Sequence, residues 1–404
     1  MGFYDIPNPD DLDPATLSLC VGCAKEPNLK RFVKANVGGG AFCGICLAPH
    51  VTDQTCSLER KGDLTNLVKS LIRFHYDESD YNPHWGGEYH PYTLLYGDNP
   101  ILEHESNLFY SRSRDWSWVF LEDLFDREPY PDPTTGVSIY AGFDGEGSRM
   151  LHRAIRRGEN WTFMNLRRRL FRENYFNVEP VARGIIERAG ARIARSIPTQ
   201  QIYFRARIGA ERFYKVDEGS VAFKPYEGDT LGAPPAPKAS SGRLNRAGVA
   251  FLYLATDLKT AAAEVRPHPS HVLSIGQFTT TKALSVAAFD VDIEGFVGSE
   301  ADLEVFDFLF TSDRAMGMPV LPEDAMGYSI TQLLADAVRN AGYDGVTFRS
   351  SVADGHNLCV FDPGGLQYVS GSAAAIAVTK VKYSTVGAAT IPEADAEDYY
   401  PVDG

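Results

Sequence analysis

The stretch from Leu231 to Arg266, LGAPPAPKASSGRLNRAGVAFLYLATDLKTAAAEVR, contains the parts of a small-molecule site in the order needed to build one. A Pro-rich loop leads to a polar turn, SGRLN at residues 241–245, and an apolar strand is predicted from Val249 to Leu254. A short helix follows and carries one carboxylate, Glu264, among alanines. Polar sites on α/β scaffolds are built where a rigid loop, a strand and a helix end together. We therefore expect the function to reside in this stretch.

Length and composition indicate a soluble, cytoplasmic protein of more than one domain. The 404 residues suffice for two or three domains, and 44% hydrophobic residues are ample for their cores. The net charge of −14 argues against a surface devoted to nucleic acid, which is therefore not an expected partner. Membrane contact is not expected either, because no apolar run reaches the roughly 18 residues that a span needs. The acidic N-terminus, MGFYDIPNPDDLDP, does not have the pattern of a signal peptide.

Four of the six cysteines form two CxxC pairs, CVGC and CGIC, at a spacing typical of a closed tetrahedral zinc site. A glycine in each pair allows backbone amides to turn toward the thiolate sulfurs. Such a site leaves no open ligand position, so the predicted zinc is structural. The alternatives are four buried free thiols, or substitution by His50 or Cys56, whereas Cys359 is predicted in the core. The predicted ligands are Cys20, Cys23, Cys43 and Cys46.

Hydrophobic periodicity predicts an α+β protein in which a zinc knuckle and a helical domain precede a C-terminal split β-sheet domain. In the helical region, apolar residues recur at helical spacing near residues 64–72 and 104–125. The predicted units are a four-cysteine zinc-binding module at 1–56, a helical domain at 57–198, a catalytic domain at 199–382 and an acidic, disordered tail at 383–404.

Short strands dominate the predicted C-terminal domain and are interrupted by two helices. The helices are predicted at 301–313 and 328–341. The strands are predicted at 201–208, 249–255, 271–280, 284–291, 345–348, 357–361 and 375–383.

A run of arginines precedes this domain and has two interpretations. It fits either an RNA-binding face of a HEPN-type ribonuclease or the solvated side of a helix bundle. The Arg-then-His arrangement that HEPN nucleases place on one helix is not found here. The run comprises Arg149, Arg153, Arg156, Arg157, Arg167, Arg168, Arg169 and Arg172.

Several polar residues of the C-terminal domain are candidates for ligand binding. Strand alternation puts Arg205 and Arg207 on one face, and Arg243 lies on a loop next to a strand that can pair with theirs. Guanidinium groups around one pocket indicate a phosphorylated or otherwise anionic ligand. Glu264 is either an exposed helix residue or a group directed into a cleft. No P-loop, dinucleotide fingerprint or G-x-S-x-G elbow is present, so those enzyme classes are not supported.

Six separated blocks, in order, resemble the RES domain, a family named for an Arg, a Glu and a Ser. The resemblance covers about residues 200–370, and the N-terminal part is similar to the HEPN-like domain of some longer RES proteins. The blocks are YFRAR, LGAPPAP, SGRLNRAG, FLYLAT, TAAAEV and GYDGVTFRSS…NLCVF.

The resemblance implies a fold like that of ADP-ribosyltransferases and an activity that degrades NAD⁺. It also implies a bacterial toxin or anti-phage effector, with an antitoxin or regulatory protein as partner and a homo-oligomer as a further expectation. The residues that match the family triad are Arg205, Glu264 and Ser350. The residues expected to contact the substrate are Arg243, Asn245, Tyr253, Ser351 and Arg207, with Ser351 an alternative to Ser350.

On this basis the predicted reaction is cleavage of the nicotinamide–ribose bond of NAD⁺ without a catalytic metal. Arg205 would hold the pyrophosphate, and Glu264 would stabilise positive charge on the ribose. Ser350 would hydrogen-bond the nicotinamide amide or the ribose. The acceptor stays open between water, phosphate and a macromolecule, which correspond to a glycohydrolase, a phosphorylase and an ADP-ribosyltransferase. The alternatives are a binding module with a degenerate pocket and a HEPN-linked RNA-binding protein or ribonuclease.

Overall fold

The computed structural model describes residues 17–38, 40, 42–43, 45–46, 54–57, 61–81, 86–87, 94–103, 151–318 and 325–382. The α-helices in these ranges are α1 (Pro27–Ala35), α2 (Lys61–His75), α3 (Glu78–Tyr81), α6 (Trp161–Arg169), α7 (Tyr175–Ala189), α8 (Leu258–Glu264), α9 (Glu300–Gly317) and α10 (Ser329–Asn340).

The strands form three sheets. A small N-terminal sheet contains β1 (Leu17–Cys20), β2 (Phe42–Cys43) and β3 (Thr55–Ser57), and a two-stranded hairpin contains β6 (Glu211–Lys215) and β7 (Ser220–Lys224). The main sheet contains β4 (Ala194–Ile197), β5 (Ile202–Ile208), β8 (Leu252–Ala255), β9 (Val272–Thr280), β10 (Leu284–Ala288), β11 (Gly345–Arg349), β12 (His356–Val360), β13 (Leu366–Tyr368) and β14 (Ala374–Ala377).

The main sheet is divided into two halves that diverge between β5 and β8. Its strand order is β13-β9-β5-β8-β12-β11-β10-β4, with β14 also paired to β9. β5 pairs with β9 over seven residues, from Ile202 to Ile208, but it meets β8 at the single pair Phe204–Ala255. Beyond that pair, the backbones of β5 and β8 are not paired with each other, and the two strands separate.

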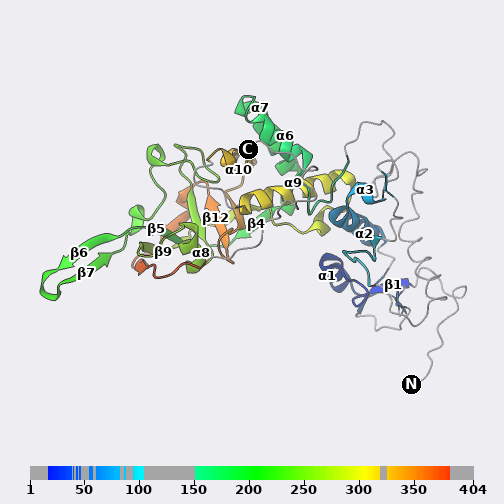
Figure 1. The fold of residues 1–404 in the computed structure, drawn as a ribbon, viewed down its shortest axis with the longest axis horizontal. Helices are drawn as coiled ribbons and strands as arrows, with labels where there is room; N and C mark the ends of the chain where they lie inside the picture. The colour runs from blue at the N-terminus through cyan, green and yellow to red at the C-terminus, as the bar shows by residue number, and fades with distance from the viewer. Residues whose placement is uncertain are drawn as a thin grey trace, which may run out of the picture.

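Helices α7, α9 and α10 pack together beside the sheet around a continuous apolar core (Figure 1). Side-chain oxygens of Asn160, Asn174 and Ser299 cap the first turns of α6, α7 and α9. Along α9, buried Leu303, Phe306 and Leu309 recur at the three-residue spacing of one helix face.

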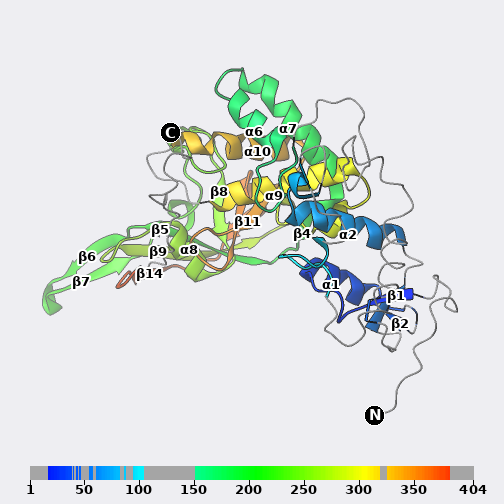
Figure 2. The same ribbon diagram turned by 45° about the vertical axis from the view of Figure 1, so that its right-hand side comes forward.

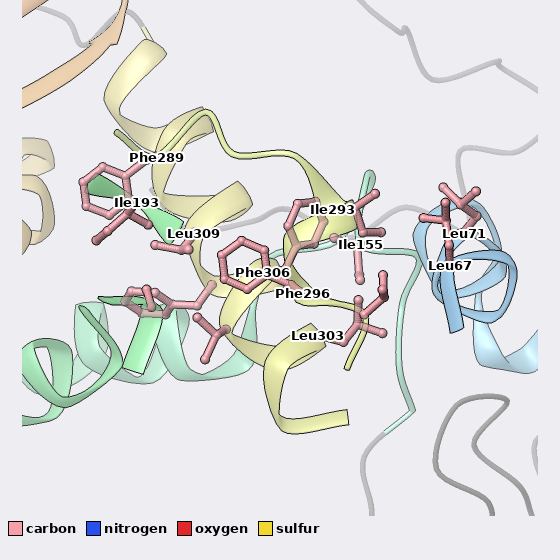
Figure 3. Close-up of a cluster of buried hydrophobic side chains, with 14 of the residues drawn as sticks. Leu67, Leu71, Ile155, Ile193, Phe289, Ile293, Phe296, Leu303, Phe306 and Leu309 are labelled. Carbon is pink, nitrogen blue, oxygen red and sulfur yellow. The ribbon is translucent and has the colours of Figure 1, made fainter. Parts of the chain in front are cut away.

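The same core reaches the N-terminal elements. Figure 3 shows Leu67 and Leu71 of α2 at one end of the cluster and Ile193 and Phe289 at the other, with the α9 side chains Leu303, Phe306 and Leu309 between them. Two arginines add polar links. Arg31 of α1 pairs with Asp292 at 2.7 Å, and Arg73 of α2 pairs with Glu300 of α9 at 3.0 Å. The N-terminal elements and the β6–β7 hairpin lie at opposite ends of the molecule (Figures 1 and 2).

The predicted α+β fold class and the C-terminal split sheet are confirmed. The strand expected from Val249 begins only at Leu252, because the Val249 amide bonds back to the Arg246 carbonyl in a turn. The predicted helix at 104–125 and tail at 383–404 lie outside the described residues, and the domain boundaries stay predictions.

The hairpin β6–β7 and the strands β1–β4 were not predicted from the sequence. Of the helices in the described ranges, none combines the length and the hydrophobicity needed to cross a lipid bilayer.

The two arginine links differ in burial and give a test of how the N-terminal helices are held. The Arg73 side chain is 3% exposed and that of Arg31 is 48% exposed. We expect Arg73→Met to lower the free energy of unfolding by about 3 kcal/mol, because it leaves acidic groups facing a buried site without their cation. Arg31→Met, the matched control, should cost less than about 1 kcal/mol. Urea unfolding measures both, and equal effects would contradict this account.

Candidate active site at the split of the sheet

A pocket of about 440 Å³ lies where β5 and β8 diverge. Its volume is within the range common for small-molecule sites. Both strands contribute to its wall, and α8 and β12 complete it. The lining residues are Phe204, Arg205, Ala206, Arg243, Tyr253, Leu254, Ala255, Ala261, Glu264, Val265, Arg266, Tyr328, Phe348 and Asn357.

The Arg205 side chain spans the gap between β5 and β8, and only some of its N–H groups have hydrogen-bond partners. Its Nη1 donates to the Tyr253 carbonyl of β8 at 2.8 Å, whereas its buried Nε has no hydrogen-bond partner. Within the described ranges, no carboxylate pairs with this guanidinium. Burial, and secondarily the charge of Arg207, lowers the pKa of Arg205 to about 10. The group is still charged at neutral pH, so the pocket contains a desolvated cation suited to an anionic ligand.

Glu264 is the last residue of α8, a helix that Asp257 caps by accepting from the Thr260 amide at 2.9 Å. A carboxylate at a helix C-terminus is electrostatically unfavourable, so helix stability does not explain its position. Glu264 lines the pocket. Of the two interpretations that the sequence allowed, the structure therefore supports a group directed into a cleft over an exposed helix residue.

Two side chains, one directly after β11 and one in β12, hold the Glu264 carboxylate. Ser350 Oγ and Asn357 Nδ2 each donate to Oε1, both at 2.6 Å. Oε2 accepts no hydrogen bond from any described residue. The amides of Val352 and Ala353 donate to Ser350 Oγ at 3.2 and 3.1 Å, which leaves the hydroxyl proton for the carboxylate. The carboxylate is therefore oriented with one oxygen fixed and the other available.

The SGRLN loop is anchored to both the sheet and α10. Tyr253 donates its hydroxyl to Asn245 Oδ1 at 2.8 Å and accepts from the Leu244 amide at 3.0 Å. Burial raises the pKa of Tyr253 well above its ordinary value, so the phenol stays neutral. Gln332 of α10 donates to the Gly242 carbonyl at 2.8 Å. A Cβ on Gly242 would lie 2.5 Å from Asn245 Oδ1, so only glycine fits this approach.

Arg243, on the same loop, reaches the C-terminus of α9. Its Nη1 donates to the carbonyls of Met316 and Met318, and its guanidinium lies 5.7 Å from the Tyr328 ring centroid. Arg243 and Tyr328 both line the pocket.

The structure thus gathers Arg205, Arg243, Tyr253 and Glu264 around one pocket, with Ser350 and Asn245 behind them. Arg207 and Ser351 are not among the lining residues. Arg207 Nη1 donates to the Thr230 carbonyl at 2.6 Å, and its guanidinium lies 4.9 Å from the Tyr226 ring centroid.

Among the polar residues that line the pocket, sequence reasoning missed three: Asn357, Arg266 and Tyr328. Asn357 opens the NLCVF block, but alternation alone could not show that its side chain reaches Glu264. Arg266 follows α8 with a positive φ of 46°, a conformation that costs a non-glycine residue about 1 kcal/mol. With Arg205 and Arg243 it gives the lining three cations against one carboxylate, in a chain whose net charge is −14. This local positive charge favours an anionic ligand.

The four cysteines of the CxxC pairs form a separate cluster. Their sulfur atoms all lie within 4.8 Å of one another, and the amides of Cys23 and Ile45 point at the sulfurs of Cys20 and Cys43. Hydrogen bonds from neighbouring thiols lower the pKa of Cys20 to about 6, whereas the pKa values of Cys23 and Cys43 are raised. All four groups can be thiolates together only with a cation among them, and the donor set suits a metal ion.

The structure also bears on the two alternative metal ligands, His50 and Cys56, and on the predicted core residue Cys359. Cys56 is buried in β3 and is not a member of the cluster, and His50 lies outside the described residues. Cys359 is fully buried in the core, as expected.

Acidic neighbours pair with much of the arginine run. Arg153 and Arg157 lie 3.7 Å from Asp77 oxygens, Arg167 lies 3.2 Å from Glu159, and Arg169 lies 2.7 Å from Glu173. Each pair has at least one exposed side chain, which favours the solvated-face interpretation over an RNA-binding one.

No curated protein matches the chain. Among solved structures, the chain is similar to the M. tuberculosis MbcT–MbcA toxin–antitoxin complex, with 17% identity over 48% of this chain and 92% of that chain. The TM-score is 0.28, too low to support any argument about this chain.

The model of the RES domain matches residues 209–378, a segment that contains β8, α8, β11 and β12. It includes Glu264, Ser350 and Asn357, and Arg205 lies just before it. Residues 209–378 of this chain are therefore similar to the RES domain.

Proposed function

We propose that the pocket binds NAD⁺ and cleaves its nicotinamide–ribose bond. The observation that carries this proposal is that a desolvated guanidinium, which has no acidic partner in the described part of the chain, shares one pocket with an oriented carboxylate. The RES domain supports the choice of NAD⁺, because the family resemblance implies degradation of that dinucleotide.

Arg205 is assigned to the pyrophosphate. Its buried Nε and its lack of a carboxylate partner among the described residues leave it able to accept an anion. Charge-assisted hydrogen bonds to phosphate oxygens would offset the cost of burying this cation. Arg243 and Arg266, in the same wall, add positive charge for the second phosphate.

Glu264 is assigned to the ribose. When the bond between ribose C1′ and the nicotinamide nitrogen breaks, its electron pair leaves with the nicotinamide, which departs as a neutral molecule. Positive charge then spreads over C1′ and the ring oxygen. A fixed carboxylate stabilises that charge more than it stabilises the bound substrate, and this difference is what accelerates a reaction. The free Oε2 is available to accept from the ribose 2′-hydroxyl.

Ser350 and Asn357 act on Glu264 as positioning residues. Both donate to Oε1, so the carboxylate cannot rotate without losing two hydrogen bonds. Fixing the charge before the reaction removes the reorganisation that water would require. This role differs from the contact with nicotinamide or ribose expected for Ser350 from the sequence.

With water as the acceptor, its oxygen bonds to C1′, one proton is released, and the products are ADP-ribose and nicotinamide. We propose this glycohydrolase reaction; phosphate as acceptor would make ADP-ribose 1″-phosphate, and a macromolecule would become ADP-ribosylated. In a cell the hydrolysis would deplete NAD⁺, as expected of a toxin or defence effector. Such an enzyme needs an antitoxin or regulatory protein to restrain it.

We also propose that Cys20, Cys23, Cys43 and Cys46 hold one structural zinc ion. With four protein ligands the ion would have no position for substrate, so it would stabilise the N-terminal sheet and take no part in NAD⁺ cleavage.

The carboxylate assignment is tested with Glu264→Gln, which keeps size and removes charge. We expect turnover of NAD⁺ to nicotinamide to fall by about 10²–10³ while NAD⁺ still binds, because the lost interaction belongs to the transition state. Glu187→Gln, on the exposed side of α7, should leave turnover unchanged. Near-normal turnover in a folded Glu264→Gln protein would exclude this mechanism.

The guanidinium assignment is tested by comparing two arginines of one strand. Arg205→Ala should weaken NAD⁺ binding as well as turnover, since it removes a contact already made with bound substrate. Arg207→Ala changes the same strand face outside the pocket lining and should have a much smaller effect. Calorimetric titration with NAD⁺ gives the affinities. Equal losses in the two variants would place the anion elsewhere.

The metal assignment predicts about one equivalent of zinc in protein purified without chelator. Cys43→Ser should lower the zinc content and the thermal unfolding temperature, because metal binding contributes to folding. Cys56→Ser, in the same sheet but outside the cluster, should retain the metal. Metal analysis that finds no zinc in the unmodified protein would remove this proposal.

A further inference from the structure

The β6–β7 hairpin extends away from the rest of the molecule as an arm (Figures 1 and 2). Its two strands pair with each other and, among the described residues, with no third strand. Every residue of β6, from Glu211 to Lys215, is exposed. A two-stranded hairpin without an apolar support is only marginally stable in water. The arm therefore has the properties of an element that becomes stable on binding something else.

Large apolar side chains of the arm are in contact with solvent. Phe213 is 53% exposed, Tyr214 is 65% exposed and Phe223 is 43% exposed. The register places Tyr214 opposite Val221 and Arg212 opposite Phe223, so these four side chains share one face. Phe213 lies on the other face, opposite Ala222. Both faces thus carry aromatic surface that association would remove from water.

The outer edge of β6 is also open, because no described residue bonds to it and its only paired neighbour is β7. An open edge adds a further strand readily through backbone hydrogen bonds. The sequence of the edge, ERFYK, then decides which strand fits.

This edge is complementary to itself. In an antiparallel pair of two β6 strands centred on Phe213, Glu211 faces Lys215 of the second copy, and Arg212 faces Tyr214 of the second copy. The first pair joins opposite charges, and the second brings a guanidinium to an aromatic ring. By symmetry each pair occurs twice, and the two Phe213 rings meet at the two-fold axis.

The other edge of the hairpin lacks this property. Antiparallel pairing of β7, SVAFK, with itself would put Lys224 opposite Ser220 and Ala222 opposite Ala222, so it gains no ion pair. β7 also lies close to β14, whereas β6 has no third strand beside it among the described residues. The complementarity therefore favours β6.

We propose that the arm is a homodimerisation element, in which β6 strands of two chains pair antiparallel around Phe213 to form a four-stranded sheet in the order β7-β6-β6-β7. The contact uses the same surface on both chains, so it closes at two subunits and does not propagate into a filament. The four-stranded sheet also supplies the extra strands that the isolated hairpin lacks. This proposal is independent of the reaction in the pocket.

The first test is the mass of the full chain in solution, by sedimentation velocity over a range of concentrations. We expect a dimer, twice the 44.5 kDa of the chain. Phe213→Glu should convert it to a folded monomer, because it places two carboxylates against each other at the axis. A monomer at every concentration in the unmodified protein would overturn the proposal and assign the arm to a different partner.

A charge exchange separates this pairing from other dimer contacts. Glu211→Lys or Lys215→Glu alone sets like charges opposite each other twice per dimer and should weaken association about tenfold. The double variant restores opposite charges and should recover the dimer. Failure of the double variant to recover it, with both single variants folded, would overturn the register.

Cross-linking tests the symmetry axis itself. Phe213→Cys should form a disulfide-linked dimer under mild oxidation that reductant reverses. Val216→Cys, at the 80% exposed tip and away from the axis, is the matched control and should form little. The unmodified protein under the same oxidant corrects for its own cysteines. Equal cross-linking at both positions would show random collision and contradict the proposal.

Discussion

The arrangement of the site depends on the way the main sheet separates between β5 and β8. A continuous ladder would place these strands side by side along their length and leave no room for a ligand. Instead they share one residue pair, and Arg205 crosses the gap to bond the Tyr253 carbonyl. The bond uses one guanidinium nitrogen and holds the two halves at a fixed separation. The pocket is therefore a consequence of lost strand pairing, and the cation that maintains it also lines it.

The pocket carboxylate, Glu264, is held by contacts to segments that are far apart in the sequence. Glu264 ends a helix of seven residues, too short to be stable by itself. Contacts with the loop that follows β11 keep this helix in place. Gly355 lies so close to Asp257 and Thr260 that a Cβ there would clash, and Ser350 and Asn357 bond the carboxylate directly. The TAAAEV block and the GYDGVTFRSS…NLCVF block are therefore far apart in the sequence but meet at the C-terminal end of α8.

The N-terminal elements share an apolar core with the C-terminal half that contains the pocket. Leu67 and Leu71 of α2 belong to the same buried cluster as Leu303 and Phe306 of α9, which in turn packs against β11. Arg243 bonds the last turn of α9, so one helix contacts both the N-terminal region and the SGRLN loop. A structural change in the N-terminal elements can therefore reach the pocket through the side chains packed around α9. The two parts share one core and are not separate bodies joined by a linker.

The sequence by itself determined what is local in this protein: the α+β class, most strands and helices of the C-terminal half, the two CxxC pairs, and Arg205, Arg243 and Glu264 as candidates. Alternation, helical spacing and motif order are properties of neighbouring residues, so they can be read without a fold. Only the tertiary structure decided that β5 and β8 separate, that Ser350 and Asn357 meet on one oxygen of Glu264, and that Arg207 lies outside the pocket lining. It also decided that β6 and β7 form an exposed arm. Each of these features depends on which strands pair and on where the pairing stops. Strand pairing is determined by packing between residues that are distant in the sequence, so local patterns do not reveal it.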